Sequence, residues 1–525
     1  MTSRPELQQA PSNLFAGAWH PIPGQSLRSC QPAHPSRDVW SGPPDPAHLQ
    51  AAVDAARAAQ PAWAAWPFEK RAAALRVFRD LATQRAEAIA TLIRDEVGKP
   101  MWDAKAEAAL LAAKVDITLE QSPTAALNRV TGFELSLTPT RAGRCWFRPH
   151  GVLGVLGPFN FPAHLPNGHI IPALAMGNTI LFKPSDKAPA VGQALAELFH
   201  DALTQAGAPA GVFNMIQGGP AIAASLASHP GLDGILFTGS WPVGRRILEA
   251  NLDRPGRLLA LEMGGNNPAI ILPDADLAQA IIECVRSAFV TTGQRCTCTR
   301  RIIIHRDIAG RVIPALCKAA SSLFIGAPDA PHPVFMGPII SKAARDAVLD
   351  AQSQMARAGG ETLVPCTAID GPGHEPGELP GWYLTPGICK VPRFVRASHS
   401  PLTHPGEDIE VFGPLLRISI ADDLDDAITQ ANATDFGLAA SIFTRDEAVA
   451  SAFAARAKAG CINWNTGTAG ASSKLPFGGL GLSGNHRPAG AFSLDYCAYP
   501  VAGMVERSNA STLAPGMHFD PAWLA

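Results

Sequence analysis

The sequence predicts an α/β protein built from two domains, each with a largely parallel sheet. After Pro149, short apolar runs alternate with helical stretches at a spacing of roughly 25–30 residues, which is typical of βα units. Apolar residues make up 47% of the 525 residues and charged residues only 17%, so the chain can bury large cores. A second set of such runs follows Gly264 and Gly265, where we expect the two domains to join.

Charge and hydropathy exclude several classes of function. The 43 Lys and Arg residues nearly balance the 45 Asp and Glu residues, and the resulting net charge of −2 argues against nucleic-acid or membrane-surface binding. No apolar run approaches the ~18 residues of a membrane span. The first residues carry Arg4 and Glu6 in place of an apolar signal core. We therefore expect a soluble cytoplasmic protein.

The ten cysteines form neither a metal-binding nor a disulfide pattern. The only close pair, Cys296 and Cys298, has no second pair and no histidine cluster at the spacing of metal ligands. We therefore expect no metal site and no disulfide scaffold.

The first part of the chain is expected to be mainly helical. Residues 46–100 carry apolar side chains at three-to-four spacing with charges between them, which predicts helix. Residues 133–137 and 144–148 predict two short strands around a turn at 138–140. Such a ribbon packs either against its own chain or against a neighbouring subunit. Residues 1–40 and 121–129 follow no recognisable pattern.

Apolar runs predict the strands of both sheets. Those of the first sheet are residues 152–156, 179–182, 212–216, 235–238 and 258–261. A helix over residues 191–205 is expected to end at Gly207 in a left-handed cap. The second sheet begins with strands at 269–272 and 301–305, and residues 422–443 predict a further helix and strand. Residues 485–525 are expected to be irregular apart from the apolar run 496–501.

Three side chains stand where chemistry is possible. Cys296 lies on a turn between a predicted helix and a predicted strand, where backbone N–H groups are free to bind a ligand. Glu262 ends an apolar strand, where burial would raise its pKa towards that of a useful base. Asn160 stands in a stiff loop rich in proline and aromatic residues, residues 157–162, which could hold an amide donor steady. Taken alone, a cysteine at such a position is more often structural, and Glu262 and Asn160 could equally be structural.

Two further segments suggest a nucleotide site. Residues 237–244 run from a strand end into a helix start, with Gly239 allowing close approach and Ser240 a candidate N-cap. This segment is not the G-x-G-x-x-G fingerprint, and alone it is a weak signal. Lys183 and Asp186 stand just beyond a strand's carboxyl end, where open α/β sheets bind ligands.

Together these segments resemble the aldehyde dehydrogenase superfamily, from about Ala51 to Pro500. Eight motifs occur in the family's order: EVGKP (96–100), GPFNFP (157–162), KPSD (183–186), FTGS (237–240), EMGG (262–265), GQRC (293–296), EVFGP (410–414) and PFGG (476–479). The resemblance implies a Rossmann-type cofactor domain, residues 1–130 and 150–262, and a second α/β catalytic domain, residues 263–470. It also implies an oligomerisation ribbon and tail, residues 131–149 and 484–525.

The resemblance assigns roles to the candidate residues. Cys296 would be the nucleophile, Glu262 the general base and Asn160 an oxyanion donor. NAD would be the cofactor, held by these residues: Lys183 and Asp186 at the adenosine ribose, Gly239, Ser240, Trp241, Pro242, Val243 and Gly244 at the pyrophosphate, and Glu410 and Phe412 at the nicotinamide. Asp186 replaces a glutamate that is common in NAD-preferring relatives. Family members that acylate coenzyme A generally lack a carboxylate at the position of Glu262, so a free acid is the expected product.

A narrower resemblance concerns the substrate. HLPNGH (164–169), LEMGGNNP (261–268), QRCTC (294–298), NWN (463–465), SGNHR (483–487) and DYCAYP (495–500) are similar to the N-succinylglutamate 5-semialdehyde dehydrogenases of arginine catabolism. That substrate is anionic, so Arg487 and His164 are candidate carboxylate donors, or else structural groups. Lys474, two residues before the PFGG motif, is a further cation that the resemblance does not lead us to expect.

Two other functions stay open at this stage. One is the oxidation of another semialdehyde, such as glutamate semialdehyde, and the other is a non-catalytic oligomeric paralogue. A paralogue without activity would be expected to lose Cys296, Glu262 or Asn160, and the sequence keeps all three. The ribbon and the run 496–501 resemble subunit-bridging elements, so we expect a homodimer or homotetramer in which Trp146, Phe147 and Tyr496 become buried on association.

Overall fold

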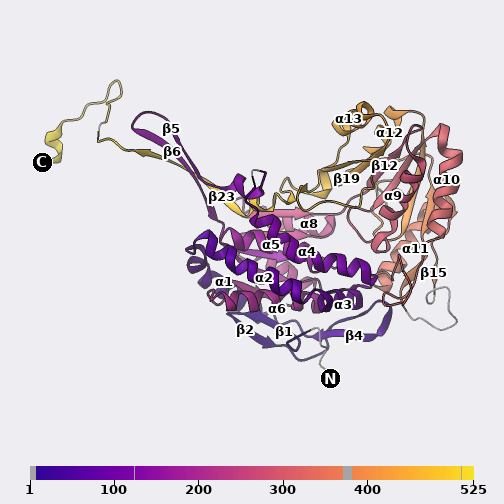
Figure 1. Cartoon of the computed structure of the whole chain (residues 1–525), viewed down its shortest axis with the longest axis horizontal. Coiled ribbons are helices and arrows are strands. Elements are labelled where there is room, and N and C mark those ends of the chain that lie inside the picture. Colours follow the sequence, from indigo (N-terminus) through magenta and orange to yellow (C-terminus); the bar gives the residue numbers. More distant parts are fainter. Residues whose placement is uncertain (1–6, 123, 370–380, 510) are drawn as a thin grey trace.

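The protein consists of two α/β halves and a projecting β-ribbon (Figure 1). This computed structural model describes residues 7–122, 124–369, 381–509 and 511–525. Each half contains one seven-stranded sheet, and the ribbon is a three-stranded sheet. The fold class predicted from the sequence is therefore confirmed. Among the described residues, no helix has the length and apolar character needed to cross a membrane.

The first sheet has five parallel strands, from β11 at one edge to β9, followed by two antiparallel strands. Its order is β11-β10-β7-β8-β9-β1-β2, with β7 at Val152–Leu156, β8 at Thr179–Lys183, β9 at Phe213–Met215, β10 at Gly234–Thr238 and β11 at Leu258–Glu262. All five parallel strands match the predicted runs to within one or two residues. Their side chains are almost all buried, as expected for a parallel sheet covered on both faces.

The antiparallel edge of this sheet was not predicted. It consists of β1 at Ser12–Phe15 and β2 at Ala18–Pro21, and β3 (Leu27–Gln31) with β4 (His34–Gly42) forms a separate hairpin. Strand β1 pairs with β9 through Leu14 and Met215. The partner lies about two hundred residues away, so local sequence carries little signal for this strand.

Helices cover both faces of the first sheet. They are α1 Ala47–Ala64, α2 Phe68–Gln84, α3 Ala86–Val97, α4 Met101–Leu119, α5 His164–Ala175, α6 Pro189–Gln205, α7 Pro220–Ser228 and α8 Trp241–Glu249. The predicted helical region 46–100 is thus three helices, with extended Pro67 preceding α2 and left-handed Gly98 ending α3. Gly207 follows α6 with φ 67°, as predicted.

The second sheet is parallel except for strand β14 at one edge. Its order is β14-β17-β18-β13-β12-β19-β20, with β12 Asn267–Ile271, β13 Thr299–His305, β14 Glu361–Val364, β17 Gly387–Lys390, β18 Leu415–Ala421, β19 Ala439–Phe443 and β20 Cys461–Trp464. Its helices are α9 Leu277–Phe289, α10 Arg306–Ser321, α11 Lys342–Arg357, α12 Leu424–Ala431 and α13 Glu447–Arg456. Ile303 packs into one core while Ile302 and Ile304 pack into another, so both faces are buried.

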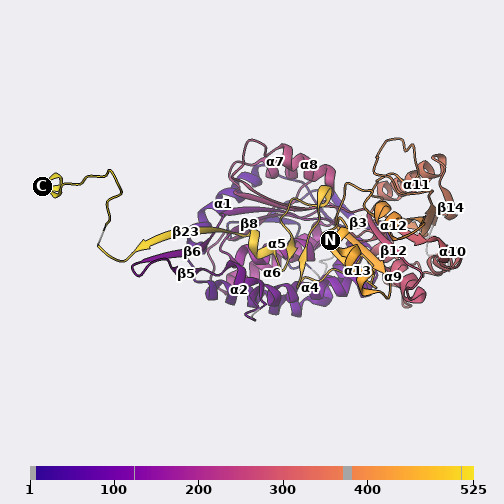
Figure 2. The ribbon, with the colours of Figure 1, turned by 90° about the horizontal axis from the view of Figure 1, so that it is seen from above.

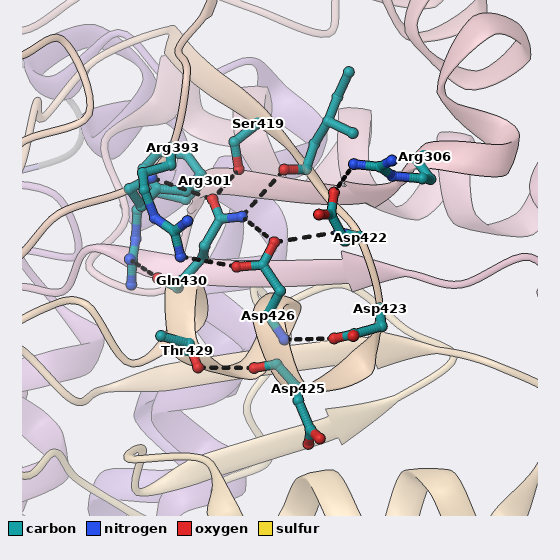
Figure 3. Close-up of polar contacts among 12 residues, drawn as sticks. Arg301, Arg306, Arg393, Ser419, Asp422, Asp423, Asp425, Asp426, Thr429 and Gln430 are labelled. Carbon is teal, nitrogen blue, oxygen red and sulfur yellow. Dashed lines mark hydrogen bonds and ion pairs between the residues drawn. The ribbon is translucent and has the colours of Figure 1, made fainter.

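Helix α12 is tied to the second sheet by side chains at both of its ends (Figure 3). At its start, Asp423 Oδ1 accepts from the Asp426 N–H at 2.8 Å. At its end, the buried Arg301 guanidinium donates to the carbonyl oxygens of Gln430 and Ala431 at 3.0 and 2.8 Å. The acidic side chains here are used in caps and ion pairs, such as Arg393 with Asp426 at 2.8 Å. This cluster therefore anchors a helix.

The ribbon and the C-terminal segment extend away from the body in both views (Figures 1 and 2). The ribbon contains β5 Phe133–Ser136, β6 Arg141–Pro149 and β23 Ala498–Glu506, in the order β23-β6-β5. Strand β23 is longer than the run predicted from the sequence. Tyr496 instead ends the short helix α14 (Ser493–Tyr496) and is already buried within the single chain, so the expectation that association buries it was wrong.

Candidate active site

A cavity of about 1100 Å³ opens where the carboxyl ends of the first sheet face loops of the second half. Twelve of the residues selected from the sequence line it: Asn160, Lys183, Asp186, Gly239, Ser240, Trp241, Pro242, Val243, Glu262, Cys296, Glu410 and Phe412. Gly244, His164 and Arg487 are not among the lining residues. The loop predicted to carry the nucleophile and the strand predicted to carry the base therefore meet at one site.

The turn before Cys296 has an unusual backbone. Thr291, Thr292 and Gly293 are all left-handed, with φ of 54°, 55° and 71°. A Cβ on Gly293 would lie 2.2 Å from the carbonyl oxygen of Gly413, so glycine is required there. The buried Arg300 holds this turn by donating to the carbonyl oxygens of Gly293, at 2.6 Å, and Arg295, at 3.0 Å.

Asn267 fixes the other side of the same loop. Its Nδ2 donates to the carbonyl oxygens of Cys296 and Cys298 at 2.7 and 2.8 Å, and its Oδ1 accepts from the Ala439 N–H at 3.0 Å. The loop is thus joined to strands β12 and β19 of the second sheet. This role of Asn267 was not predicted, because its partners are backbone groups distant in the sequence.

Helix α4 holds both loops of the site from beneath. Asp103 accepts from the Arg295 guanidinium at 2.8 Å, next to Cys296. One turn later, Glu107 accepts from the backbone N–H groups of Ala163 and His164 at 3.0 and 3.1 Å, just after Asn160. Both carboxylates are almost fully buried. Two acidic residues four positions apart in an otherwise alanine-rich helix were a signal that the sequence interpretation overlooked.

The Asn160 side chain is held next to the cysteine loop. Its Nδ2 donates to the Gln294 carbonyl oxygen at 2.9 Å, and Gln294 Oε1 in turn accepts from the Ile340 N–H at 3.0 Å. An amide nitrogen carries two hydrogens, so this contact orients the group and leaves a second donor for a ligand. The arrangement suits an oxyanion donor.

Burial raises the pKa values of both candidate reactive groups. The pKa of the Cys296 thiol is raised to about 12, mainly by burial and further by the carboxylates of Glu410 and Glu262. Burial also raises the pKa of Glu262 well above its usual value, although an N–H contact from Ala489 opposes this. Glu262 Oε2 is buried without a hydrogen-bond partner. Cys296 is therefore a thiol at rest, and a base must help to form the thiolate.

Glu410 and Phe412 are fixed at the wall of the cavity. Glu410 Oε1 accepts from the Gly265 N–H at 3.1 Å, and a Cβ on Gly264 would lie 1.9 Å from the other carboxylate oxygen. Phe412 packs edge-on against Phe159, with ring centroids 5.9 Å apart. These two side chains therefore have defined positions before any ligand binds.

The remaining part of the cavity has features that a dinucleotide requires. Helix α8 begins after Ser240, whose side chain makes no cap hydrogen bond, so its N-terminal N–H groups are not satisfied by that hydroxyl. Ser240 does occupy the N-cap position of α8, as predicted, but with no cap hydrogen bond from its side chain. Gly244 serves packing, since a Cβ there would lie 2.3 Å from Met263 Sδ. Lys183 and Asp186 lie at the carboxyl end of β8.

The two candidate substrate-binding cations are placed apart from the cavity. His164 is held neutral because burial, with the nearby Lys114 and Lys99, lowers its pKa to about 3. Its Nδ1 is buried without a hydrogen-bond partner. Arg487 is exposed and donates to the carbonyl oxygen of its neighbour His486 at 3.3 Å. The structure therefore does not bring His164 or Arg487 to the other site residues.

Comparison with known proteins agrees with this geometry. The sequence matches the profile of the Aldehyde dehydrogenase family over residues 23–500. It is 41% identical to N-succinylglutamate 5-semialdehyde dehydrogenase 2 of Caulobacter vibrioides, covering 95% of this chain and 97% of the relative. It is also 41% identical to the N-succinylglutamate 5-semialdehyde dehydrogenase of Burkholderia mallei, covering 96% of this chain and 99% of the relative.

Solved structures show the same fold. Lactaldehyde dehydrogenase from Escherichia coli superimposes with a TM-score of 0.83 at 27% identity, covering 94% of this chain and 99% of that one. The NADP-dependent glyceraldehyde-3-phosphate dehydrogenase from Bacillus halodurans, solved with NADP, gives a TM-score of 0.82 at 28% identity. The match covers 95% of this chain and 100% of that one. The chain belongs to the aldehyde dehydrogenase family.

Proposed function

We propose that this enzyme oxidises N-succinylglutamate 5-semialdehyde to N-succinylglutamate, a step of arginine catabolism, with NAD as the oxidant. The observation that carries the chemistry is the meeting of Cys296, Glu262 and Asn160 at one cavity. The substrate rests on the relatives that are 41% identical along nearly the whole chain. A nicotinamide cofactor, when bound, supplies the hydride acceptor for the oxidation.

The residues of the chain provide the other steps. Glu262 or a water beside it takes the proton of the Cys296 thiol, and the thiolate adds to the aldehyde carbon. The Asn160 amide and the Cys296 N–H donate to the oxyanion, and one such donor is typically worth ~10²–10³ in rate. After oxidation, Glu262 deprotonates the water that hydrolyses the thioester and releases the acid.

Two alternatives remain as outcomes of experiment. Oxidation of another semialdehyde, such as glutamate semialdehyde, would use the same Cys296 and Glu262. A non-catalytic oligomeric paralogue is disfavoured because Asn160, Glu262 and Cys296 are all present and all line the cavity.

NAD is favoured over NADP by the charges near β8. The Asp186 carboxylate could accept from a ribose 2′-hydroxyl but would repel a 2′-phosphate. Burial lowers the pKa of Lys183 to about 8, with Asp186 opposing this, and Lys183 Nζ already donates to the Pro184 carbonyl oxygen at 2.9 Å. Lys183 is therefore already engaged in part at the end of β8, and the proposed preference for NAD rests on Asp186.

The ribbon supports a proposal of self-association. Trp146, Tyr499 and Met504 are exposed on its strands, with 46%, 55% and 67% of their surfaces accessible. Nine residues of β23 pair with nine of β6, and this extended sheet stands clear of the body (Figure 2). Exposed apolar side chains on such a sheet favour burial against a second copy, which gives a homodimer or homotetramer.

The substrate is tested with a panel of aldehydes, followed as absorbance of reduced cofactor. We expect kcat/KM for N-succinylglutamate semialdehyde to exceed those for glutamate semialdehyde, succinate semialdehyde and propanal by at least about tenfold, since remote contacts help to align the aldehyde. A wild-type enzyme that is no better on the succinylated substrate than on propanal would contradict the assignment.

The nucleophile is tested by comparing two cysteines. Cys296→Ala should reduce turnover to below about one thousandth, because no other thiol can form the thioester. Cys298→Ala is the matched control, since its thiol is fully buried and points to the Val290 carbonyl oxygen at 3.7 Å. It should keep most of the activity. Equal losses in both variants would refute the role of Cys296.

Cofactor choice is tested at Asp186. Asp186→Ser removes the repulsive charge, so the ratio of kcat/KM with NAD to that with NADP should fall about tenfold. Lys187→Ser, an exposed neighbour on the same loop, is the control for a general change in local charge. The proposal fails if the wild-type enzyme already prefers NADP.

Association is tested by light scattering at micromolar concentration. We expect a mass of two or four times the 55.1 kDa of one chain. Trp146→Asp should lower that mass by placing a charge in an apolar interface. Ile282→Asp changes an exposed apolar residue on α9, away from the ribbon, and should leave the mass unchanged. A wild-type mass near that of a single chain would exclude the proposal.

A further inference from the structure

A chain of hydrogen bonds runs behind the cavity wall. The Tyr496 hydroxyl, on α14, lies 2.7 Å from His169 Nδ1 on α5. His169 Nε2 lies 3.1 Å from Thr238 Oγ1, at the end of β10. Tyr496 and His169 are almost fully buried, whereas Thr238 lines the cavity. Three elements distant in the sequence therefore converge on one polar path that ends at the site.

The charges at the two ends favour one direction for this chain. His169 is neutral, because burial and the nearby Lys114 lower its pKa to about 3. A neutral imidazole donates from one nitrogen and accepts at the other, so the hydrogens must all point the same way. At the inner end, Lys114 Nζ lies 3.5 Å from Ser493 Oγ, and Ser493 is in turn a hydrogen-bond neighbour of the Tyr496 hydroxyl. The ammonium group of Lys114 attracts oxygen and nitrogen lone pairs and repels hydrogens. The hydrogens therefore point outward, from Tyr496 to His169 to Thr238.

The outer end of the chain lies beside the general base. Thr238 and Glu262 are register partners on the neighbouring parallel strands β10 and β11, and both line the cavity. Register partners in a sheet place their side chains on the same face. Glu262 Oε2 lacks a hydrogen-bond partner, and the Glu262 charge also acts on Tyr496. No hydrogen bond joins Thr238 and Glu262 in this structure, but Glu262 Oε2 is without a donor on the same face of the sheet as the Thr238 hydroxyl.

We propose that Tyr496, His169 and Thr238 are positioning residues that present the Thr238 hydroxyl hydrogen to the Glu262 side of the cavity and so hold the Glu262 carboxylate ready for thioester hydrolysis. This inference rests on the proposed role of Glu262 as base. It assigns no direct chemistry to His169 or Tyr496, which act only through Thr238.

A donor next to the carboxylate has a defined effect on pH dependence. Hydrogen bonding to the charged form lowers the pKa of a carboxyl group, and so opposes the effect of burial on Glu262. Glu262 acts as a base only when deprotonated. Loss of the donor would therefore lower turnover at neutral pH and shift its rise to higher pH. The other titratable groups that interact with Glu262 are Cys296, Cys461 and Tyr496. Those that face His169 are Lys114 and Tyr496.

Tyr496→Phe breaks the inner link of this chain with the loss of one oxygen. Without the phenol donor, the neutral His169 ring can carry its hydrogen on Nδ1 and accept the Thr238 hydroxyl hydrogen at Nε2. That tautomer turns the Thr238 hydrogen away from the cavity. We expect an unchanged single-turnover burst of reduced cofactor, and a steady-state kcat about tenfold lower at pH 7. The rise of kcat with pH should move up by about one unit. Tyr383→Phe is the matched control, a fully buried tyrosine on β16 (Tyr383–Leu384) of a separate small sheet.

Variants of His169 provide a second test. Glutamine keeps one donor and one acceptor, so His169→Gln should retain several times the kcat of His169→Leu, with thermal unfolding showing that both are folded. Equal kcat for these two variants would overturn the proposal. A Tyr496→Phe enzyme that loses burst and steady state in equal proportion, without a pH shift, would also overturn it, since that is the effect of structural damage.

Glu262→Gln separates this inference from the function on which it rests. If Glu262 is the base, the variant should form the thioester, release one burst of reduced cofactor and then stall. Normal turnover of Glu262→Gln would refute the proposed role of Glu262. A stalled Glu262→Gln together with a Tyr496→Phe enzyme that matches Tyr383→Phe would refute the chain alone.

Discussion

Two buried carboxylates on helix α4 set the geometry on which the site depends. Asp103 holds the loop of Cys296, and Glu107 holds the loop of Asn160. A buried carboxylate costs several kcal/mol unless it is paired and hydrogen-bonded, so these contacts have few alternatives. Because the two residues lie one helical turn apart, their spacing fixes the two loops relative to each other. The candidate nucleophile and the candidate oxyanion donor thus share one rigid support.

Burial has opposite effects on different steps of the chemistry. It raises the pKa of Cys296 to about 12 and that of Glu262 well above its usual value, so burial disfavours the charged form of both groups. The thiolate is therefore scarce until a proton moves. The same low-polarity surroundings strengthen the hydrogen bonds from Asn160 and the backbone to a developing oxyanion. Burial thus weakens the cysteine as a nucleophile at rest, and it also strengthens the stabilisation of negative charge that develops during the reaction.

Local sequence predicted the parts of the fold that depend on local patterns. Strand β7 was predicted with its observed bounds, and Gly207 has the left-handed backbone expected from its position. Strand β1 was missed because its partner Met215 is distant in the sequence. The candidate residues Cys296 and Glu262 were selected from motifs, and the structure places both at the cavity. The supports of these residues are tertiary contacts between single side chains, and no periodicity reveals them.

The candidate substrate cations show where reasoning by charge alone fails. An anionic aldehyde needs a donor, but three cations around the Cys296 and Asn160 loops already have partners. Arg295 is paired with Asp103, Lys99 with Glu107, and Arg300 with backbone carbonyl oxygens. The field at Cys296 is therefore set by the carboxylates of Glu410 and Glu262, which disfavour a second negative charge close by. Recognition of a substrate carboxylate consequently belongs at a distance from the reacting carbon, where solvent weakens that repulsion.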